Sequence, residues 1–236
     1  ASFGAALAIL FGASALMIQV SAFCFGLAAV AAAYFASSVL TRQSGGATLT
    51  LVLTGMVVSA LFSAFISIVK FVGDPYDTLP TITFWLMGGL TYVTKGDLFI
   101  MLIPFAAGMI PLLLLRWRLN ILSFDDEEAS SLGVDTKKTR AVIILCATLM
   151  SSSAVAVGGM IGWVGLIVPH IARMLTGPDY SRMLPCSMLT GGLFLLIVDD
   201  IARCLFAQEI PLGVLTAIIG APFFLYLMFR GKKSFI

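Results

Sequence analysis

Long apolar runs separated by short polar interruptions make up most of this chain, and they predict membrane-spanning helices. A helix needs about 20 mainly apolar residues to cross a bilayer, and fewer when it is short and enclosed by protein. The sequence predicts segments at about 2–18, 21–41, 48–72, 98–117, 138–157, 163–175, 183–206 and 213–230. The sixth of these eight is too short to span alone, and an amphipathic piece, 79–90, lies between the third and the fourth. The expected fold is therefore an all-α, polytopic bundle of membrane helices.

Composition excludes an ordinary soluble domain. Hydrophobic residues make up 60% of the chain and charged residues 11%, whereas charged residues approach a quarter of a soluble domain. The net charge of +2 gives no support for a nucleic-acid partner. This composition is typical of a protein embedded in a lipid bilayer.

Lys and Arg fall almost entirely on one side if the eight segments alternate across the membrane. That side carries Arg42, Arg116, Arg118, Lys137, Lys138, Arg140, Arg173, Arg182, Arg230, Lys232 and Lys233. Only Lys70 and Lys95 fall on the other side, while Arg203 lies near the end of a helix. Because cytoplasmic loops carry the excess of basic residues, we expect the first segment to run outward and the C-terminus to be cytoplasmic.

The stretch from Gly158 to Arg173 is apolar but poorly suited to a continuous helix. It carries four glycines and Pro169, and the only histidine of the chain, His170, precedes Arg173. Glycine costs about 1 kcal/mol and proline about 3 kcal/mol in a helix interior, and broken helices at membrane depth are tolerated beside protein or a wet cavity. We expect a turn at 158–162 and a short returning helix, which favours a transporter over a simple anchor. His170 is expected to be structural, not a ligand.

Small residues recur at every fourth position of the third segment, at Gly55, Ser59, Ser63 and Ser67. This spacing places them in one stripe along the helix. The stripe is typical of close helix packing, but it also suits the wall of a translocation path, where hydroxyl groups line a wet cavity. The two interpretations are compatible if the stripe lies at an interface between two subunits.

Charged residues close the seventh segment. Asp199 and Asp200 lie four and three residues before Arg203, so either carboxylate can face the guanidinium on a helix. Ionised residues inside a membrane usually pair or face water. A structural ion pair and a surface-facing arginine remain alternatives, and a proton relay is disfavoured because no chain of acids or histidines leads away.

The longest cytoplasmic loop, 116–140, is expected to contain a short helix at about 120–134. Ser123 is the expected N-cap and Gly133 the expected C-cap, and four acids occupy the first turns, where the helix dipole favours them. The helix is either a solvated connector or a rigid handle that a partner protein binds.

Cofactor chemistry has no visible site in the sequence. No Gly-x-x-x-x-Gly-Lys-Ser/Thr loop occurs, and Cys24, Cys146, Cys186 and Cys204 form no CxxC pair. We therefore expect no catalytic residue, metal site or cofactor in this chain. If transport by this protein uses ATP and Mg²⁺, a separate ATPase subunit binds them.

Taken together, the segments resemble the permease subunit of FecCD-type (type II) ABC importers for iron-siderophores, haem and cobalamin. The resemblance covers essentially the whole chain. Its strongest parts are GWVGLIVPHIAR (162–173), IPLGVLTA (210–217), GAPF (220–223), FWLMGG (84–89) and LNILSFDDEEASSLG (119–133). The family has ten membrane helices, and residues 2–5 resemble the start of the third. The resemblance thus implies that two N-terminal helices are missing and that 1–236 is one permease domain.

The resemblance also assigns roles to residues. ATPase coupling is implied for a loop at about 119–138, with Asp125, Asp126, Glu127, Glu128, Ala129, Leu132 and Gly133. Segment 48–72, with its small-residue stripe, would line the path between two copies, and 79–90 would be a short outer helix at its mouth. Arg203 and Glu209 would dock a substrate-binding protein. Asp200 matches the family's acid, whereas Asp199 stands where a small apolar residue is expected.

The implied mechanism is ATP-driven alternating access in a bacterial or archaeal cytoplasmic (inner) membrane. The implied partners are a second permease copy, two ATPase subunits and a periplasmic or lipid-anchored binding protein. Iron-siderophore is the commonest cargo of such importers, with haem, cobalamin and molybdate as alternatives. An ion-coupled secondary transporter, which would also use broken helices, and a purely structural membrane subunit are the rival classes.

Overall fold

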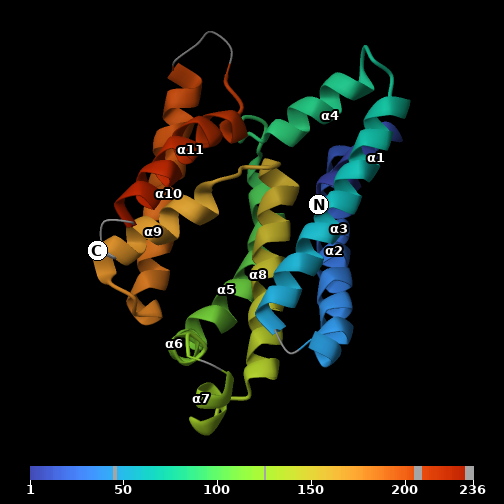
Figure 1. Ribbon diagram of the computed structural model, residues 1–236. Helices are drawn as coiled ribbons and strands as arrows, with labels where there is room; N and C mark the ends of the chain where they lie inside the picture. The colour runs from blue at the N-terminus through green and yellow to red at the C-terminus, as the bar shows by residue number, and fades with distance from the viewer. Residues whose placement is uncertain (45–46, 125, 205–208, 232–236) are drawn as a thin grey trace. The chain divides into compact units, whose positions relative to one another are not determined.

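The computed structural model describes residues 1–44, 47–124, 126–204 and 209–231, and it is built from helices (Figure 1). The helices are α1 (Ser2–Leu10), α2 (Ala15–Ser44), α3 (Ala47–Val72), α4 (Thr78–Met87), α5 (Lys95–Leu114), α6 (Arg116–Ile121), α7 (Asp126–Ser131), α8 (Thr136–Gly158), α9 (Val164–Thr176), α10 (Tyr180–Cys204) and α11 (Leu212–Gly231). Every regular element in these described ranges is a helix, which confirms the all-α class.

Five of the described helices are long and apolar enough to cross a membrane. The spans are Ala15–Leu40, Leu49–Val72, Lys95–Leu114, Thr136–Gly158 and Tyr180–Cys204. Each agrees with an expected segment to within a few residues, apart from an earlier start of α2. The expected outer piece is α4, and the expected short helix after the glycine-rich stretch is α9, which has 13 residues.

The first expected segment, 2–18, is wrong in its extent, because α1 ends at Leu10. Gly12 has a φ of +65°, and the N–H of Ala13 donates to the Ala8 carbonyl. This left-handed turn is a common way of ending a helix. A new helix then begins at Ala15. The apolar run in the sequence is continuous here, but the helix is not.

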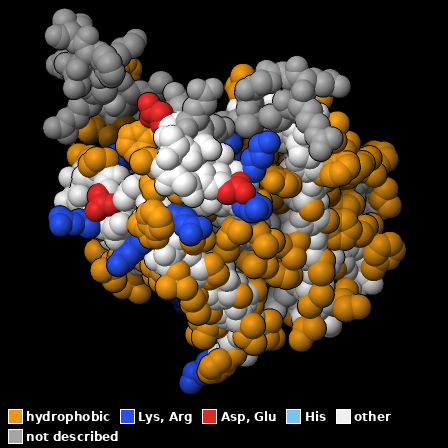
Figure 2. Space-filling view, turned by 90° about the horizontal axis from the view of Figure 1, so that it is seen from below, with side chains coloured by type: hydrophobic (Ala, Val, Ile, Leu, Met, Phe, Trp, Pro, Cys, Tyr) orange, Lys and Arg blue, Asp and Glu red, His pale blue; other side chains and the backbone are white. Residues whose placement is uncertain are grey.

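Large apolar side chains cover the surfaces of the long helices. On α5, Ile103 is 76% exposed, and on α10, Leu189 is 77% exposed. Hydrophobic side chains, drawn orange, make up much of the face in Figure 2, with Lys and Arg beside a few acids on part of it. Apolar surface of this extent is unfavourable in water and suits lipid or a protein neighbour.

The described chain divides into two compact units. The first holds residues 1–86, 93–106 and 147–159, and the second holds 87–92, 107–146 and 160–236. In the first unit, α1 packs on α2 and α3. Its helices approach closely at Gly4, where an added Cβ would lie 2.9 Å from that of Phe25, and the Ser21 hydroxyl donates to the Gly4 carbonyl.

The glycine-rich stretch breaks as expected. The helix α8 ends at Gly158, Gly159 has a φ of +69°, and α9 begins only at Val164. Trp163, the residue before α9, also lies in the left-handed region at φ +67°. A non-glycine residue with this φ is uncommon, so the packing around Trp163 must hold the turn in place. Part of that packing comes from α11, because a Cβ added at Gly220 would lie 2.6 Å from the Trp163 Cβ.

Three backbone segments of the second unit meet at glycines. An added Cβ at Gly213 would lie 2.7 Å from the Met160 carbonyl oxygen and would also clash with the Met87 carbonyl. One at Gly88, where φ is +68°, would lie 2.6 Å from the same Met160 oxygen. The N–H of Leu212 donates to the Gly88 carbonyl at 3.0 Å. We call this meeting point the glycine junction.

Replacing Gly213 by alanine is therefore expected to destabilise the second unit. The new methyl group meets two backbone carbonyls, which cannot rotate away, and overpacking of this kind costs about 1–3 kcal/mol. The measurement is the thermal midpoint of the purified protein in detergent. Gly192→Ala on α10 is the matched control, because no atom lies within 4 Å of an added Cβ there. Equal midpoints for the two variants would contradict the junction's tight packing.

Candidate docking and coupling sites

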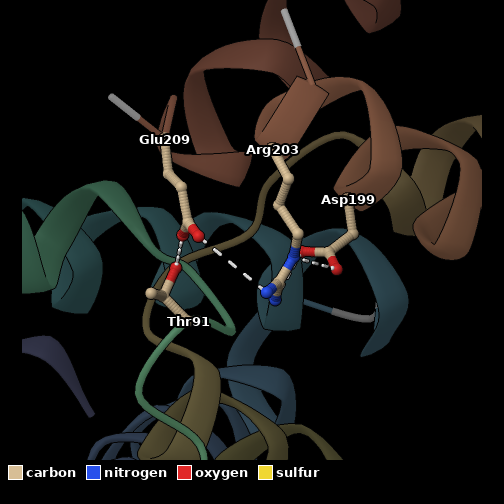
Figure 3. Close-up of polar contacts among 4 residues, drawn as sticks. All are labelled: Thr91, Asp199, Arg203 and Glu209. Atoms are coloured by element: carbon tan, nitrogen blue, oxygen red, sulfur yellow. Dashed lines mark hydrogen bonds and ion pairs between the residues drawn. The ribbon is translucent and has the colours of Figure 1, made fainter. Parts of the chain in front are cut away.

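A cluster of charged side chains lies at the C-terminal end of α10 (Figure 3). The Nε of Arg203 donates to the Asp199 carboxylate at 2.8 Å, and a second guanidinium nitrogen lies 3.9 Å from Glu209. Glu209 in turn accepts a hydrogen bond from the Thr91 hydroxyl. We call Thr91, Asp199, Arg203 and Glu209 the Arg203 cluster.

The glycine junction and a small apolar core position this cluster. Glu209 lies three residues before Leu212, whose N–H bonds to Gly88, and Thr91 lies three residues after Gly88. Beneath them, Val198 and Ala202 of α10 are buried with Leu212 and Leu215 of α11. Residues 209–211, just before α11, and the loop after α4 are thereby placed beside the end of α10.

The pairing within the cluster answers a question that the spacing left open. Of the two aspartates, the structure pairs Asp199 with Arg203, whereas the Asp200 side chain is exposed. The side chains of Arg203 and Glu209 are 41% and 40% exposed. Exposed ion pairs contribute about 0–1 kcal/mol to stability, so this cluster is better suited to recognition than to holding the fold.

The loop between α5 and α8 contains two short helices, α6 and α7, in place of the single helix expected at 120–134. Ser123 is not an N-cap: its hydroxyl donates to the Asn120 carbonyl at 2.5 Å and so belongs to the end of α6. The C-cap is confirmed at Gly133, which has a φ of +79°, and the N–H of Val134 donates to the Ala129 carbonyl.

The helix α7 buries one face and exposes another. Ala129 is completely buried, whereas Leu132 is 60% exposed and Glu128 is exposed. Asp125, like Lys232 and Lys233, lies outside the described residues, and of Asp126 and Glu127 only the backbone is described. An acid and an apolar side chain on one short helix can together bind a partner.

The start of α8 is capped by Asp135, directly after the α7 turn. The Lys138 N–H donates to the Asp135 carboxylate at 3.1 Å, and the Lys138 ammonium lies 3.2 Å from it. These contacts, the backbone hydrogen bond first, lower the pKa of Asp135. The capping fixes where α7 sits at the head of α8.

A link between α6 and α10 was not anticipated. The Asn120 amide nitrogen donates to Asp179 at 2.8 Å, and the Asn120 oxygen accepts the N–H of Tyr180 at 2.8 Å. Asp179 also accepts the N–H of Ser181, and this bond and the one from Asn120 lower the pKa of Asp179. A Gly-Pro-Asp sequence before an apolar run signals a helix N-cap, but its partner lies 59 residues away.

The small-residue stripe lies on an open side of α3. Ser59, Ser63 and Ser67 are exposed and Gly55 is partly exposed, with no atom within 4 Å of an added Cβ at Gly55. The hydroxyl of Ser67 donates back to the Ser63 carbonyl. Close packing inside the described part of the chain therefore does not explain the stripe.

Metal-ligating side chains do not gather in the described ranges. No group of three or more His, Cys, Asp or Glu residues there could hold a metal ion. His170 is exposed on α9.

Comparison with known proteins gives relatives over almost the whole chain. The FecCD transport family model matches residues 1–230. The chain is 41% identical to the molybdate import system permease protein MolB of Haemophilus influenzae, covering 99% of this chain and 68% of the relative. It is 39% identical to the cobalamin import system permease protein BtuC of Halobacterium salinarum, covering 85% and 53%. It is 35% identical to the hemin transport system permease protein HmuU of Yersinia pestis, covering 83% and 58%.

A solved structure of the metal-chelate ABC transporter type, in an inward-facing conformation, is similar in fold. The TM-score is 0.90 at 41% identity, and the match covers 97% of this chain and 72% of that one. The chain thus spans between about half and two thirds of the length of the curated relatives named above. The sequence match and the shared fold agree, and the chain belongs to the FecCD transport family.

Proposed function

We propose that this chain is the membrane-spanning permease subunit of a binding-protein-dependent ABC importer. The family match over residues 1–230 carries the proposal. The relatives are named as permeases for molybdate, cobalamin and hemin, and the fold matches a metal-chelate type transporter. Residues 1–236 would act as one permease domain, with ATP hydrolysed on a separate subunit and no catalytic residue or cofactor here.

An ion-coupled secondary transporter is the less favoured alternative. Such a protein needs an ion-coupling acid on its path, but α3 carries no Asp or Glu along its length. The intramembrane acids of α10 lie at the helix end, where Asp199 is already paired with Arg203.

The path is proposed to run along α3. Its exposed small-residue stripe would face a second copy of the permease on a two-fold axis. Small hydroxyl side chains leave room for a bulky cargo and offer it weak hydrogen bonds. The class of cargo is a metal chelate or oxyanion, with iron-siderophore, haem, cobalamin and molybdate as candidates, and selectivity would reside largely in the binding protein.

The two ends of α10 would face opposite sides of the membrane. The Arg203 cluster would face outward and dock the substrate-binding protein, while α6, α7 and the cytoplasmic C-terminus would face the ATPase. The excess of basic residues in the loops on the ATPase side supports this orientation. Glu128 and Leu132 are the described, exposed α7 side chains that would contact the ATPase.

Uptake into liposomes tests the function directly. With the full-length permease, ATPase and binding protein reconstituted together, we expect chelate uptake that requires both ATP and the binding protein. The measurement compares uptake of radiolabelled iron-siderophore, haem, cobalamin and molybdate. Uptake that proceeds equally without ATP would overturn the proposal in favour of ion coupling.

Arg203→Glu is expected to weaken binding-protein affinity by roughly tenfold, because the reversed charge repels a partner carboxylate. Titration of the labelled binding protein onto the reconstituted permease gives the affinity. The effect should grow at low salt, since screening of exposed charges is weaker there. Arg173→Glu, an equal charge change on the exposed C-terminal end of α9, is the control. If both variants bind like the wild type, Arg203 serves only as the ion-pair partner of Asp199.

Glu128→Lys is expected to lower the amount of ATPase that copurifies with the permease, because it reverses an exposed charge on α7. Adding Glu127→Lys should lower it further. The yield of complex on a size-exclusion column gives the result. Asp77→Lys, an exposed acid just before α4, is the control and should leave the yield unchanged. Equal yields for all variants would argue that α7 is a solvated connector.

A further inference from the structure

The Asn120 side chain uses both ends of its amide to bind the start of α10. Its nitrogen donates to the Asp179 carboxylate, and its oxygen accepts the Tyr180 N–H, each at 2.8 Å. Rotating the amide by 180° would place donor against donor and acceptor against acceptor. The geometry therefore admits one orientation, and the two hydrogen bonds hold α6 in a fixed register on α10.

The helix α6 depends on such a link. It has six residues, and isolated helices shorter than about 12 residues are marginal in water. In the second unit it packs against α10. Asn120 lies in the last turn of α6, at its boundary with the loop that leads to α7, and so attaches the beginning of the coupling segment to α10.

The other end of α10 carries the Arg203 cluster. The helix has 25 residues, which corresponds to a length of about 37 Å at 1.5 Å per residue. The helix continues through Pro185 to Cys204, so a displacement applied at Tyr180 is passed along it toward Arg203. The Asn120 link thus connects the candidate ATPase-coupling region to the candidate docking cluster through one continuous helix.

We propose that Asn120 is a positioning residue that makes the coupling segment and α10 move as one body, so that ATPase movement reaches the docking end. The inference rests on the proposed importer function and deepens it. A purely structural brace would affect only assembly and stability. A coupling link would instead affect how far the loaded binding protein stimulates ATP hydrolysis, and how much cargo is imported per ATP.

A charge swap separates these two roles in the reconstituted full assembly. Asn120→Asp sets a second carboxylate against Asp179 and breaks the link by repulsion. Asp179→Asn keeps an oxygen that accepts from Asn120 and from the Ser181 N–H, so it serves as the matched control. In the double variant, the carboxylate introduced at 120 accepts from the Tyr180 N–H and from the amide introduced at 179, which restores the link with its polarity reversed. The bond from the Ser181 N–H is given up, because in the wild type Asn120 and Ser181 donate to the same Asp179 oxygen.

The expected result is that Asn120→Asp reduces stimulation of the ATPase by loaded binding protein by about fivefold or more, the scale of a typical coupling energy. Complex yield and thermal midpoint should fall by less than the stimulation does, and the stimulation is therefore compared per assembled complex. Asp179→Asn and the double variant should both retain stimulation and cargo imported per ATP.

Two outcomes would overturn this inference while the wild type still imports cargo. One is unchanged stimulation in Asn120→Asp. The other is a loss of stimulation that matches a loss of complex yield and that the double variant does not restore. Failure of the wild-type assembly to import cargo with ATP would instead overturn the proposed function itself, and the inference with it.

Discussion

The close approach of three backbones at the glycine junction is the constraint on which the candidate docking site depends. Gly88 and Gly213 have no Cβ, so the chain around them can lie directly against the Met160 carbonyl. That approach lets Leu212 bond to Gly88 and brings Thr91 and Glu209 together. Packing density in proteins leaves no room to accommodate a methyl group against fixed carbonyls. The charged cluster therefore depends on the absence of side chains nearby.

Most of the helices could be predicted from sequence, because long apolar runs have few alternative structures in a membrane. The break after Gly158 was predictable for a similar reason, since glycines and a proline gathered there. The break at Gly12 was not. Its residues are as apolar as those of a span, and a single glycine inside an apolar run is usually tolerated in a helix; only the observed left-handed φ distinguishes it.

The candidate sites were predictable only where the partners lie close in sequence. The spacing of Asp199 and Arg203 on one helix indicated an ion pair but could not decide between two aspartates three and four residues away. The coupling loop was located, yet Ser123 was misassigned because a serine before acids also fits the end of the preceding helix. Asn120 and Asp179 are brought together by tertiary packing, which no local pattern encodes.

The ion pair between Asp199 and Arg203 also bears on how docking would proceed. A docking protein's carboxylate must share the guanidinium with two carboxylates of this chain, one at 2.8 Å and one at 3.9 Å. Because an exposed pair is worth about 1 kcal/mol or less, exchanging one carboxylate for another changes the free energy little. Such a surface favours rapid, reversible association over tight binding. The proposed binding protein would need this property, since it would have to leave after each delivery.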